Sequence, residues 1–418
     1  MNILWVTNTI YPSAAKVIGC KSLHATSWID AMANSVNRLD DVSLSIFFPG
    51  YTNKFIKYVN DNIIFYASAN ESNMKDDIDY VMEDFKPDII HMYGTEKRHN
   101  LYIIEKYGNI PSVISLQGII SGYINHYFGG MTFRQILKST SVGFADVFLR
   151  RGIFREYYEW KKQIPYERTI IEKAHYFEGR SDWDQAVLRT INRDAIYFSL
   201  PRAIRNDFYN FAWDSTSIKS HTIFVHQGDS PRKGVHFVFE AISVLKEVFP
   251  DVKLYISGND PFNKFSYIRG YNKFLYKLIN SLNIKSNIVF TGRMTAGEVA
   301  ERLSKCSLCI IPSSIDNAAN SIAEAMIVGT PVLSSFVGGS PYMLGYGEYG
   351  YLYAYNEPEM LASKIEYIFN NPDEAIRKSN LGKEIAFERH DITQLTKSLL
   401  NIYDEVINDF NSVKSHVT

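Results

Sequence analysis

The chain has 418 residues, of which 46% are hydrophobic and 21% charged, and its formal net charge is −1. This length exceeds the size at which single hydrophobic cores stop growing, so we expect two domains. The near-zero charge gives no global attraction for nucleic acid or an anionic membrane, so such affinity needs a local patch. The sequence contains no apolar run of about 18 or more residues, the length that a membrane-spanning helix needs. Residues 1–8 lack the basic start and cleavage site of a signal peptide, so we expect a cytoplasmic protein.

The first half of the chain alternates short apolar runs with helical periodicity. Strands are predicted at residues 2–7, 44–48, 63–66, 88–92, 113–116 and 196–200. Helices are predicted around residues 23–36 and 74–85. Apolar strands separated by helices indicate a parallel sheet covered on both faces.

The second half repeats this pattern after a polar stretch near residues 210–220 that lacks periodicity. Strands are predicted at residues 222–226, 252–256, 288–291, 308–311 and 332–334. Helices are predicted at residues 235–249, 274–282, 296–304, 321–328 and 392–407. We therefore expect two doubly wound α/β domains, 1–212 and 213–390, followed by a helix and tail at 391–418. Such domains bind ligands at the carboxyl ends of their strands, so the expected site is a cleft between the two sheets.

The three cysteines, Cys20, Cys306 and Cys309, are a poor disulfide framework and fit a reducing compartment. Cys306 and Cys309 have zinc-like spacing, but no second pair of Cys or His lies nearby and the surrounding residues are apolar. We predict a buried strand there and no metal site.

The stretch 311–335 carries the most information about function. An apolar strand ends at Pro312, a polar loop follows, and a helix is expected from Asn320 and Ser321, both good N-cap residues. The amides and the positive dipole end of this helix suit a phosphate.

Two carboxylates and two glycines accompany this helix. Asp316 lies in the loop and Glu324 lies eight residues later, one turn into the helix. Both carboxylates are therefore able to hold hydroxyls of one extended ligand. Gly338 and Gly339 permit close approach of the backbone to a ligand.

At these residues the chain resembles the retaining glycosyltransferases of family 4, within glycosyltransferase group 1. These enzymes have the GT-B fold, two Rossmann-like domains facing a central cleft, and the resemblance implies a C-terminal helix that crosses back to the first domain. The signature is an acidic residue, seven others and a Glu, followed by a Gly-Thr-Pro-Val run. Asp316 stands where members usually have Glu. The resemblance is dense over about residues 224–339 and thin over the first 210.

The resemblance implies a role for each of these residues. Glu324 would bind the ribose hydroxyls of a nucleoside-diphosphate sugar, and Asp316 the hydroxyls of the donor sugar. The amides around Ala319, Asn320 and Ser321 would hold the sugar and the pyrophosphate. The family also implies that no metal or other cofactor is required. The alternative to these roles, for each residue taken singly, is that Glu324 is a solvated helix residue and that Asp316 forms a turn.

A second motif follows the predicted strand 222–226. Residues 225–234 read Val-His-Gln-Gly-Asp-Ser-Pro-Arg-Lys-Gly, which resembles the family's Gly-Arg loop ending in Lys-Gly. The resemblance implies that Lys233 neutralises the donor diphosphate as a point charge, with Gly228 as the loop glycine. Asp229 stands in place of the family's Arg, so Arg232 is the candidate for the missing charge. A surface loop is the alternative for Lys-Gly alone.

Further donor contacts are expected from both halves of the chain. Gly19 resembles the family's glycine beside the donor phosphates, although Cys20 replaces a second glycine that is often present. Lys21 and Ser22 are candidates for contact with a phosphate or the acceptor, or are surface residues. Arg293, after a predicted strand, resembles the strand end that holds the nucleobase.

The family binds its acceptor in the N-terminal domain, where this chain departs from the pattern. Gln117 stands where related enzymes commonly have a His that positions sugar and acceptor. A Gln forms hydrogen bonds but cannot serve as a general base. The proton acceptor is then another group, with Glu96, His126 and Asp316 as unranked candidates, or the leaving phosphate oxygen itself. His91 is a cleft candidate, or a satisfied core histidine.

Residues 182–184 read Asp-Trp-Asp, the metal-and-nucleotide motif of the other large glycosyltransferase fold, GT-A. Three-residue matches arise often by chance, and the second half fits the metal-free fold. We predict that Arg180 beside this motif is a cation in the cleft, or is solvated or structural.

Residues 131–175 contain nine Lys/Arg against five Asp/Glu, interleaved with aromatic residues. This basic and aromatic insertion is a candidate for peripheral contact with the inner face of a membrane, as suits a lipid-linked acceptor. A packed helical insertion with a solvated basic face is the alternative.

The sequence thus predicts a retaining transferase that moves a sugar to a saccharide or lipid-linked acceptor, by family analogy in bacterial surface polysaccharide synthesis. Two other functions stay open. One is a nucleotide-sugar epimerase of the same fold, and the other is a non-catalytic partner that binds a sugar nucleotide or stabilises another transferase. No nucleic-acid partner is expected.

Overall fold

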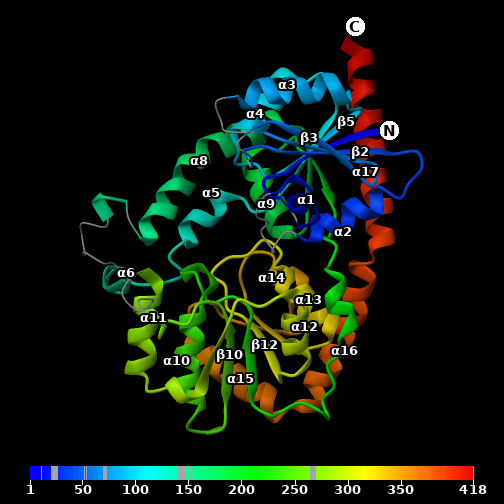
Figure 1. Ribbon diagram of the computed structural model, residues 1–418. Coiled ribbons are helices and arrows are strands. Elements are labelled where there is room, and N and C mark those ends of the chain that lie inside the picture. The colour runs from blue at the N-terminus through cyan, green and yellow to red at the C-terminus, as the bar shows by residue number, and fades with distance from the viewer. Residues whose placement is uncertain are drawn as a thin grey trace. The chain divides into compact units, whose positions relative to one another are not determined.

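The computed structural model describes residues 1–10, 12–19, 27–50, 52, 54–68, 73–139, 147–150, 152–263 and 270–417. The chain folds into two compact units (Figure 1). Unit 1 comprises Met1–Ser121, Gln163–Arg205 and His390–Thr418. Unit 2 comprises Gly122–Lys162 and Asn206–Arg389.

Unit 1 is built on an eight-stranded sheet of order β3-β4-β2-β1-β5-β6-β7-β8, in which only the β3–β4 pair is antiparallel. Its strands are β1 (Asn2–Val6), β2 (Ser43–Phe48), β3 (Ile56–Asn60), β4 (Ile63–Ala67), β5 (Ile89–Tyr93), β6 (Ser112–Ser115), β7 (Tyr176–Gly179) and β8 (Ile196–Ser199). The central strand β1 has apolar residues on both faces because helices cover both sides of the sheet.

The helices of unit 1 supply the two apolar layers against this sheet. They are α1 (Pro12–Ile18), α2 (Ser27–Val36), α3 (Met74–Phe85), α4 (Arg98–Lys106), α9 (Asp182–Ile191) and α17 (Ile392–Val417). Helices α2 and α17 bury their apolar faces on one side, and α3 on the other. Two further helices, α5 (Ile120–Tyr123) and α8 (Ile153–Lys173), contain residues of both units.

A buried polar network ties α17 to the sheet of unit 1. The indole N–H of Trp5 donates to the Tyr403 hydroxyl at 2.9 Å. Since the hydroxyl accepts this bond, its own proton is available to the Nδ1 atom of His91, 2.7 Å away. The Nε2 atom of His91 lies 3.5 Å from a carboxylate oxygen of Glu178. The C-terminal helix therefore packs on unit 1, as predicted.

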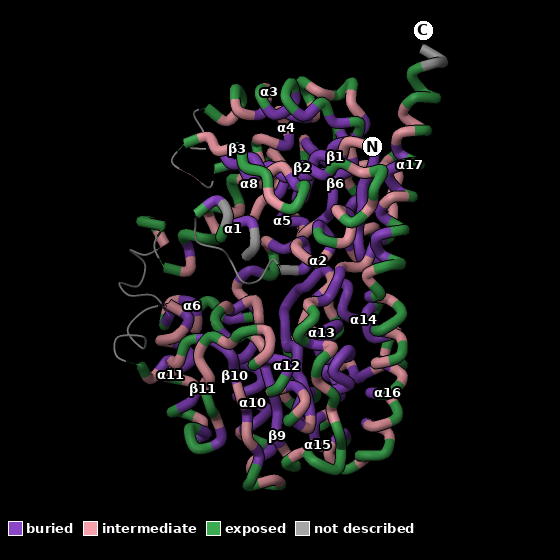
Figure 2. Tube along the Cα trace, turned by 45° about the vertical axis from the view of Figure 1, so that its right-hand side comes forward, coloured by how far each residue is buried: buried purple, intermediate pink, exposed green. Residues whose placement is uncertain are grey.

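Unit 2 is built on a six-stranded sheet of order β11-β10-β9-β12-β13-β14, in which all neighbouring strands are parallel. Its strands are β9 (Thr222–Val225), β10 (Lys253–Ser257), β11 (Ile288–Gly292), β12 (Leu308–Ile311), β13 (Val332–Ser335) and β14 (Tyr351–Tyr353). Its helices are α6 (Phe133–Ser139), α10 (Val235–Leu245), α11 (Gly270–Ser281), α12 (Ala296–Ser304), α13 (Asn320–Val328), α14 (Ser340–Met343), α15 (Pro358–Asn370) and α16 (Pro372–Arg389). Figure 2 shows β9 and β10 largely buried among these helices.

The inserted segment, residues 122–162, differs from its predicted place. The sequence predicts an insertion at 131–175 in the N-terminal domain, whereas the structure groups residues 122–162 with unit 2. The reason is apolar packing, because Met131, Ile136 and Phe154 join the core around α10. The order of segments along the chain suggested that the insertion belongs to the first domain, but these apolar side chains are buried in the core of unit 2.

The two predicted parallel α/β sheets are present, and the helices expected at residues 74–85 and 296–304 have those bounds. Three strands were not predicted: β3, β7 and β14. In β3 three of five residues are exposed, and β14 has only three residues, so neither gives a long apolar run. In β7 the buried Glu178 interrupts the apolar pattern.

Candidate functional site

A pocket lies at the carboxyl ends of β9 and β12 in unit 2. Its lining includes His226, Gln227, Lys233, Ser313 and Ser321. Carboxyl ends of parallel strands are where doubly wound sheets bind ligands, so this pocket is the candidate ligand site of unit 2.

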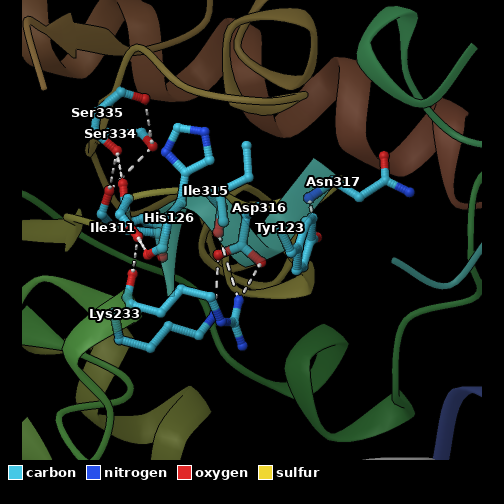
Figure 3. Close-up of polar contacts among 12 residues, drawn as sticks. Tyr123, His126, Lys233, Ile311, Ile315, Asp316, Asn317, Ser334 and Ser335 are labelled. Carbon is cyan, nitrogen blue, oxygen red and sulfur yellow. Dashed lines mark hydrogen bonds and ion pairs between the residues drawn. The ribbon is translucent and has the colours of Figure 1, made fainter. Parts of the chain in front are cut away.

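Three charged side chains meet beside this pocket. The Nζ atom of Lys233 lies 2.9 Å from Oδ2 of Asp316, and Nη1 of Arg232 lies 3.9 Å from Oδ1 (Figure 3). Burial lowers the pKa of Lys233, and its pairing with Asp316 opposes that shift. Burial alone would raise the pKa of Asp316, but the two cations hold it below its usual value. Asp316 is therefore ionised at neutral pH and is a weak proton acceptor.

The loop that carries Asp316 is fixed by its backbone. The Asp316 carbonyl accepts the Gly339 N–H at 3.0 Å. Gly338 has a φ of +53°, and a Cβ atom there would lie 1.9 Å from the Asp316 carbonyl oxygen. The glycine pair was predicted to allow close approach to a ligand, but Gly338 allows close approach to the Asp316 backbone.

Helix α13 begins beside the same loop. The predicted N-cap residues Asn320 and Ser321 are its first two helical residues, and the N-cap is Ala319, whose side chain forms no capping bond. By contrast, Thr295 and Glu298 form a capping box at the start of α12. The first turn of α13 thus presents backbone amides and a positive dipole end without a side-chain cap.

Glu324 lies inside α13 and is 4% exposed. Its Oε2 atom lies 3.5 Å from Nδ1 of His226, which follows β9 and was not singled out from the sequence. The pair joins the ends of β9 and α13 at the pocket. The only sequence signal for His226 was its place in the loop that contains Lys233.

Other donor-site candidates of unit 2 lie farther along the sheet edge. Gly228 is buried, and a Cβ atom there would lie 2.6 Å from Ile256. Asp229, in place of the family's Arg, accepts the backbone N–H of Asn259 at 2.7 Å. Arg293 is exposed just beyond β11.

His126, a candidate proton acceptor, lies in the inserted segment and therefore in unit 2. Its backbone carbonyl accepts the Ser314 hydroxyl at 2.9 Å. Loss of hydration lowers the pKa of its imidazole, so the neutral, proton-accepting form prevails at pH 7.

In unit 1, two arginines meet Gln117 at the carboxyl end of β6. Arg180 donates to the Gln117 carbonyl oxygen at 2.8 Å, and Arg202 donates to its side-chain oxygen. The Arg202 guanidinium lies 4.0 Å from the centre of the Trp28 ring. The predicted residues Gln117 and Arg180 are thus brought together.

The Asp-Trp-Asp sequence of unit 1 has a local structural role. Asp184 closes a capping box with Ser181 at the start of α9, and its other oxygen accepts the Arg180 N–H at 2.8 Å. The described residues contain no group of three or more His, Cys, Asp or Glu side chains placed to hold a metal ion. Cys306 and Cys309 are buried, and burial raises the pKa of Cys306 to about 12.

The remaining candidate site residues of unit 1 have other hydrogen-bond partners than Gln117. Glu96 accepts a bond from the Asn8 amide at 3.0 Å, and burial raises the pKa of its carboxyl. His91 is 1% exposed and hydrogen-bonded to Tyr403. It is therefore a core histidine with a satisfied ring nitrogen, which was the alternative to a cleft residue. Gly19 ends α1 with a φ of +75°. Residues 20–22, including Cys20, Lys21 and Ser22, lie outside the described part of the chain.

Comparison with known proteins shows which family the second half of the chain resembles. Residues 214–385 match the sequence profile of the family Glycosyl transferases group 1. An uncharacterised glycosyltransferase from Methanocaldococcus jannaschii is 29% identical over 346 residues, which are 78% of this chain and 88% of that protein. A phosphatidyl-myo-inositol mannosyltransferase from Mycobacterium leprae is 26% identical over 193 residues, covering 46% of this chain and 48% of the relative. The second match thus spans about half of each protein.

Solved structures resemble the whole chain at low sequence identity. Sucrose-phosphate synthase from Thermosynechococcus elongatus has a TM-score of 0.70 and 14% identity, over 98% of this chain and 99% of that one. HepE from Anabaena in complex with UDP has a TM-score of 0.69 and 15% identity, over 97% and 100%. These likenesses define the fold class, which is GT-B. Residues 214–385 thus resemble the Glycosyl transferases group 1 family, and the relatives matched in sequence include glycosyltransferases.

Proposed function

We propose that the chain is a retaining, metal-independent glycosyltransferase that uses a nucleoside-diphosphate sugar as donor. The observation that carries this proposal is the pocket of unit 2, which is lined by Lys233, by His226 and by Ser321 at the uncapped start of α13. Asp316 pairs with Lys233 and Arg232 beside this pocket, and Glu324 pairs with His226. Two cations and a helix N-terminus suit a diphosphate, and two carboxylates suit the hydroxyls on either side of it. HepE, of the same fold, was solved with UDP and with UDP-glucose.

Each charged group has one expected role in the reaction. Lys233 and the amides of α13 would stabilise the negative charge that develops on the leaving diphosphate. Glu324 would hold the ribose and Asp316 the donor sugar, which fixes the anomeric carbon in place. Since Lys233 and Arg232 supply positive charge at the diphosphate, no metal ion is needed for that purpose.

The transfer step retains the configuration at the anomeric carbon. The bond between that carbon and the diphosphate oxygen breaks, and the diphosphate keeps the electron pair. The acceptor hydroxyl attacks from the same face, and its proton passes to the departing phosphate oxygen or to a base. Asp316 is poorly suited to be that base because its pKa is held low, which leaves Glu96 and His126 among the candidates.

A donor screen tests this proposal. The full chain is incubated with UDP-, GDP- and ADP-sugars in EDTA, and slow hydrolysis and thermal stabilisation are followed. We expect one donor to be hydrolysed and to stabilise the protein, and both effects to be lost in Glu324→Ala. Hydrolysis that needs added metal would contradict metal independence. Conversion of the sugar without release would indicate the epimerase. Stabilisation without hydrolysis would indicate the non-catalytic binding partner.

We further propose that the acceptor is a saccharide or a lipid-linked saccharide in surface polysaccharide synthesis, reached at a membrane surface through the inserted segment. Phe133, Phe148 and Leu149 are exposed by 60%, 83% and 56%, and basic residues Arg134 and Arg150 lie beside them. Exposed aromatic and basic side chains together suit an anionic lipid surface. None of the described helices has the length and apolar character needed to cross a membrane.

Flotation with phosphatidylglycerol vesicles tests the membrane contact. We expect the chain to float with these vesicles at low salt, and Phe148→Ser with Leu149→Ser to weaken flotation. Equal flotation with neutral phosphatidylcholine vesicles, or none at all, would contradict the proposal.

A further inference from the structure

The inserted segment bonds directly to the loop that carries Asp316. The backbone N–H of Asn317 donates to the Tyr123 hydroxyl oxygen at 2.6 Å, and Tyr123 is only 8% exposed (Figure 3). The Ser314 hydroxyl donates to the His126 carbonyl at 2.9 Å. Two residues of the segment therefore hold both ends of the short stretch 314–317.

The same segment packs against the loop that carries Lys233. Gly129 has a φ of +60°, and a Cβ atom there would lie 1.9 Å from the Pro231 carbonyl oxygen. The Gly129 carbonyl accepts the Nε2–H of His236 at 3.0 Å, while the Tyr271 hydroxyl donates to Nδ1 of His236 at 2.6 Å. This contact allows no side chain at residue 129 and fixes the segment over Pro231.

Aromatic rings of the segment also flank Arg232. The guanidinium carbon of Arg232 lies 5.3 Å from the centre of the Tyr123 ring and 5.7 Å from that of Trp160. Such contacts attract a guanidinium and restrict its orientation. In this structure the same guanidinium faces Asp316 at 3.9 Å.

We propose that Tyr123 is a positioning residue for the sugar nucleotide, acting through two parts of its side chain, the hydroxyl and the ring. Its hydroxyl fixes the Asn317 amide and with it the adjacent Asp316, and its ring orients Arg232 toward the diphosphate. The inference deepens the proposed function and rests on it, because it assumes that Asp316 and Arg232 contact the donor. Sequence patterns gave no sign of this role, since Tyr123 lies 194 residues before Asn317.

The hydroxyl is tested by Tyr123→Phe, which keeps the ring beside Arg232. We expect KM for the donor to rise about 3- to 10-fold, the usual worth of one buried hydrogen bond, with kcat changed less than twofold. Hydrogen exchange of peptides covering residues 313–317 should become faster. Tyr123→Leu removes the ring as well and should raise KM further.

The matched control is Tyr127→Phe. Tyr127 lies in the same aromatic cluster, its ring 5.4 Å from that of Trp160, but its hydroxyl bonds to Glu156 at 3.0 Å. We expect this variant to keep the wild-type donor KM and the wild-type exchange of residues 313–317.

The outcomes separate this inference from the proposed function. If Lys233→Met and Glu324→Ala lose donor binding while Tyr123→Phe keeps wild-type KM and exchange, the role of Tyr123 is refuted and the donor site stands. A loss of thermal stability in Tyr123→Phe with unchanged KM would likewise reduce Tyr123 to a structural residue. If all of these variants bind donor like wild type, the donor site itself is refuted.

Discussion

Lys233 and Asp316 are 83 residues apart in the chain, and their charged atoms lie 2.9 Å apart in unit 2. Both side chains are largely buried, at 18% and 12% exposure. A donor diphosphate would take the place of the Asp316 carboxylate at Lys233. We expect the carboxylate that is released to turn to the donor sugar, so that nucleotide binding and sugar positioning are linked.

Asp316→Asn is expected to separate nucleotide binding from sugar transfer. The variant removes the anion that competes for Lys233 but leaves that cation buried without its partner, which is destabilising. The free protein should therefore lose about 1–3 kcal/mol of stability, and a nucleoside diphosphate should restore more stability than it gives to wild type. Thermal unfolding with and without UDP, GDP or ADP measures this. Weaker binding of every diphosphate than in wild type would contradict the linkage.

Lys233→Met should weaken donor binding by removing a charge-assisted contact. Such contacts are worth about 1.5–3 kcal/mol, or about 10- to 150-fold in the dissociation constant. Lys305→Met is the matched control, because Lys305 is 61% exposed on the surface of unit 2 and pairs with Glu301. Calorimetric titration should show the loss for residue 233 and wild-type affinity for residue 305. Similar affinities in both variants would remove Lys233 from the donor site.

The stability of unit 2 should depend on the protonation of His236. Burial lowers the pKa of His236 from 6.5 to about 4. Because the folded state prefers the neutral ring, its contribution is complete above pH 6.5 and is lost as the pH falls from 6.5 toward 4. The loss is about 3 kcal/mol at most, since one pKa unit corresponds to about 1.4 kcal/mol.

Denaturant unfolding of wild type and His236→Gln between pH 7 and pH 4.5 measures this effect. The variant should be less stable at pH 7 and should show a smaller decrease on acidification. Parallel pH curves for the two proteins would show that His236 does not titrate as the structure predicts.

Tyr403→Phe should destabilise unit 1 and leave the donor site of unit 2 unchanged. The substitution removes the partner of the Trp5 indole and of His91 Nδ1, and an unsatisfied buried polar group costs about 1–3 kcal/mol. Tyr367→Phe, which removes the hydroxyl of an exposed tyrosine bonded to Glu374, should change stability by less than about 0.5 kcal/mol. Equal stability of the two variants would show that the buried network contributes little.

Much of the fold was predicted from the sequence because most neighbouring strands of both sheets are parallel and the central strands are buried. Strands such as β1 and β9 are short, almost continuous apolar runs, which is the pattern of a strand buried on both faces. The unit to which the inserted segment belongs could not be predicted from the sequence, because it depends on which hydrophobic core buries Met131 and Phe154. Periodicity identifies an apolar face but not its partner.

Part of the candidate site was predicted from the sequence. The sequence distinguished Asp316, Glu324 and Lys233 because they stand in a recognisable strand–loop–helix pattern. It did not predict that Tyr123 bonds to the loop of Asp316 or that His226 pairs with Glu324, since these contacts join segments far apart in the chain. The N-cap of α13 was also missed, because propensity favours Asn and Ser whereas the helix begins after Ala319. The roles of Gln117 and Arg180 in acceptor binding stay predictions.

The central claim is that unit 2 binds a nucleoside-diphosphate sugar through Glu324 without a metal ion. Its most direct test is calorimetric titration of UDP, GDP and ADP into the full chain in EDTA, with wild type and Glu324→Ala side by side. We predict that one of the three binds wild type and that its affinity falls about 10- to 150-fold in the variant, as expected for a lost charge-assisted contact. Equal affinity in both proteins, or binding only after a divalent cation is restored, would contradict the claim.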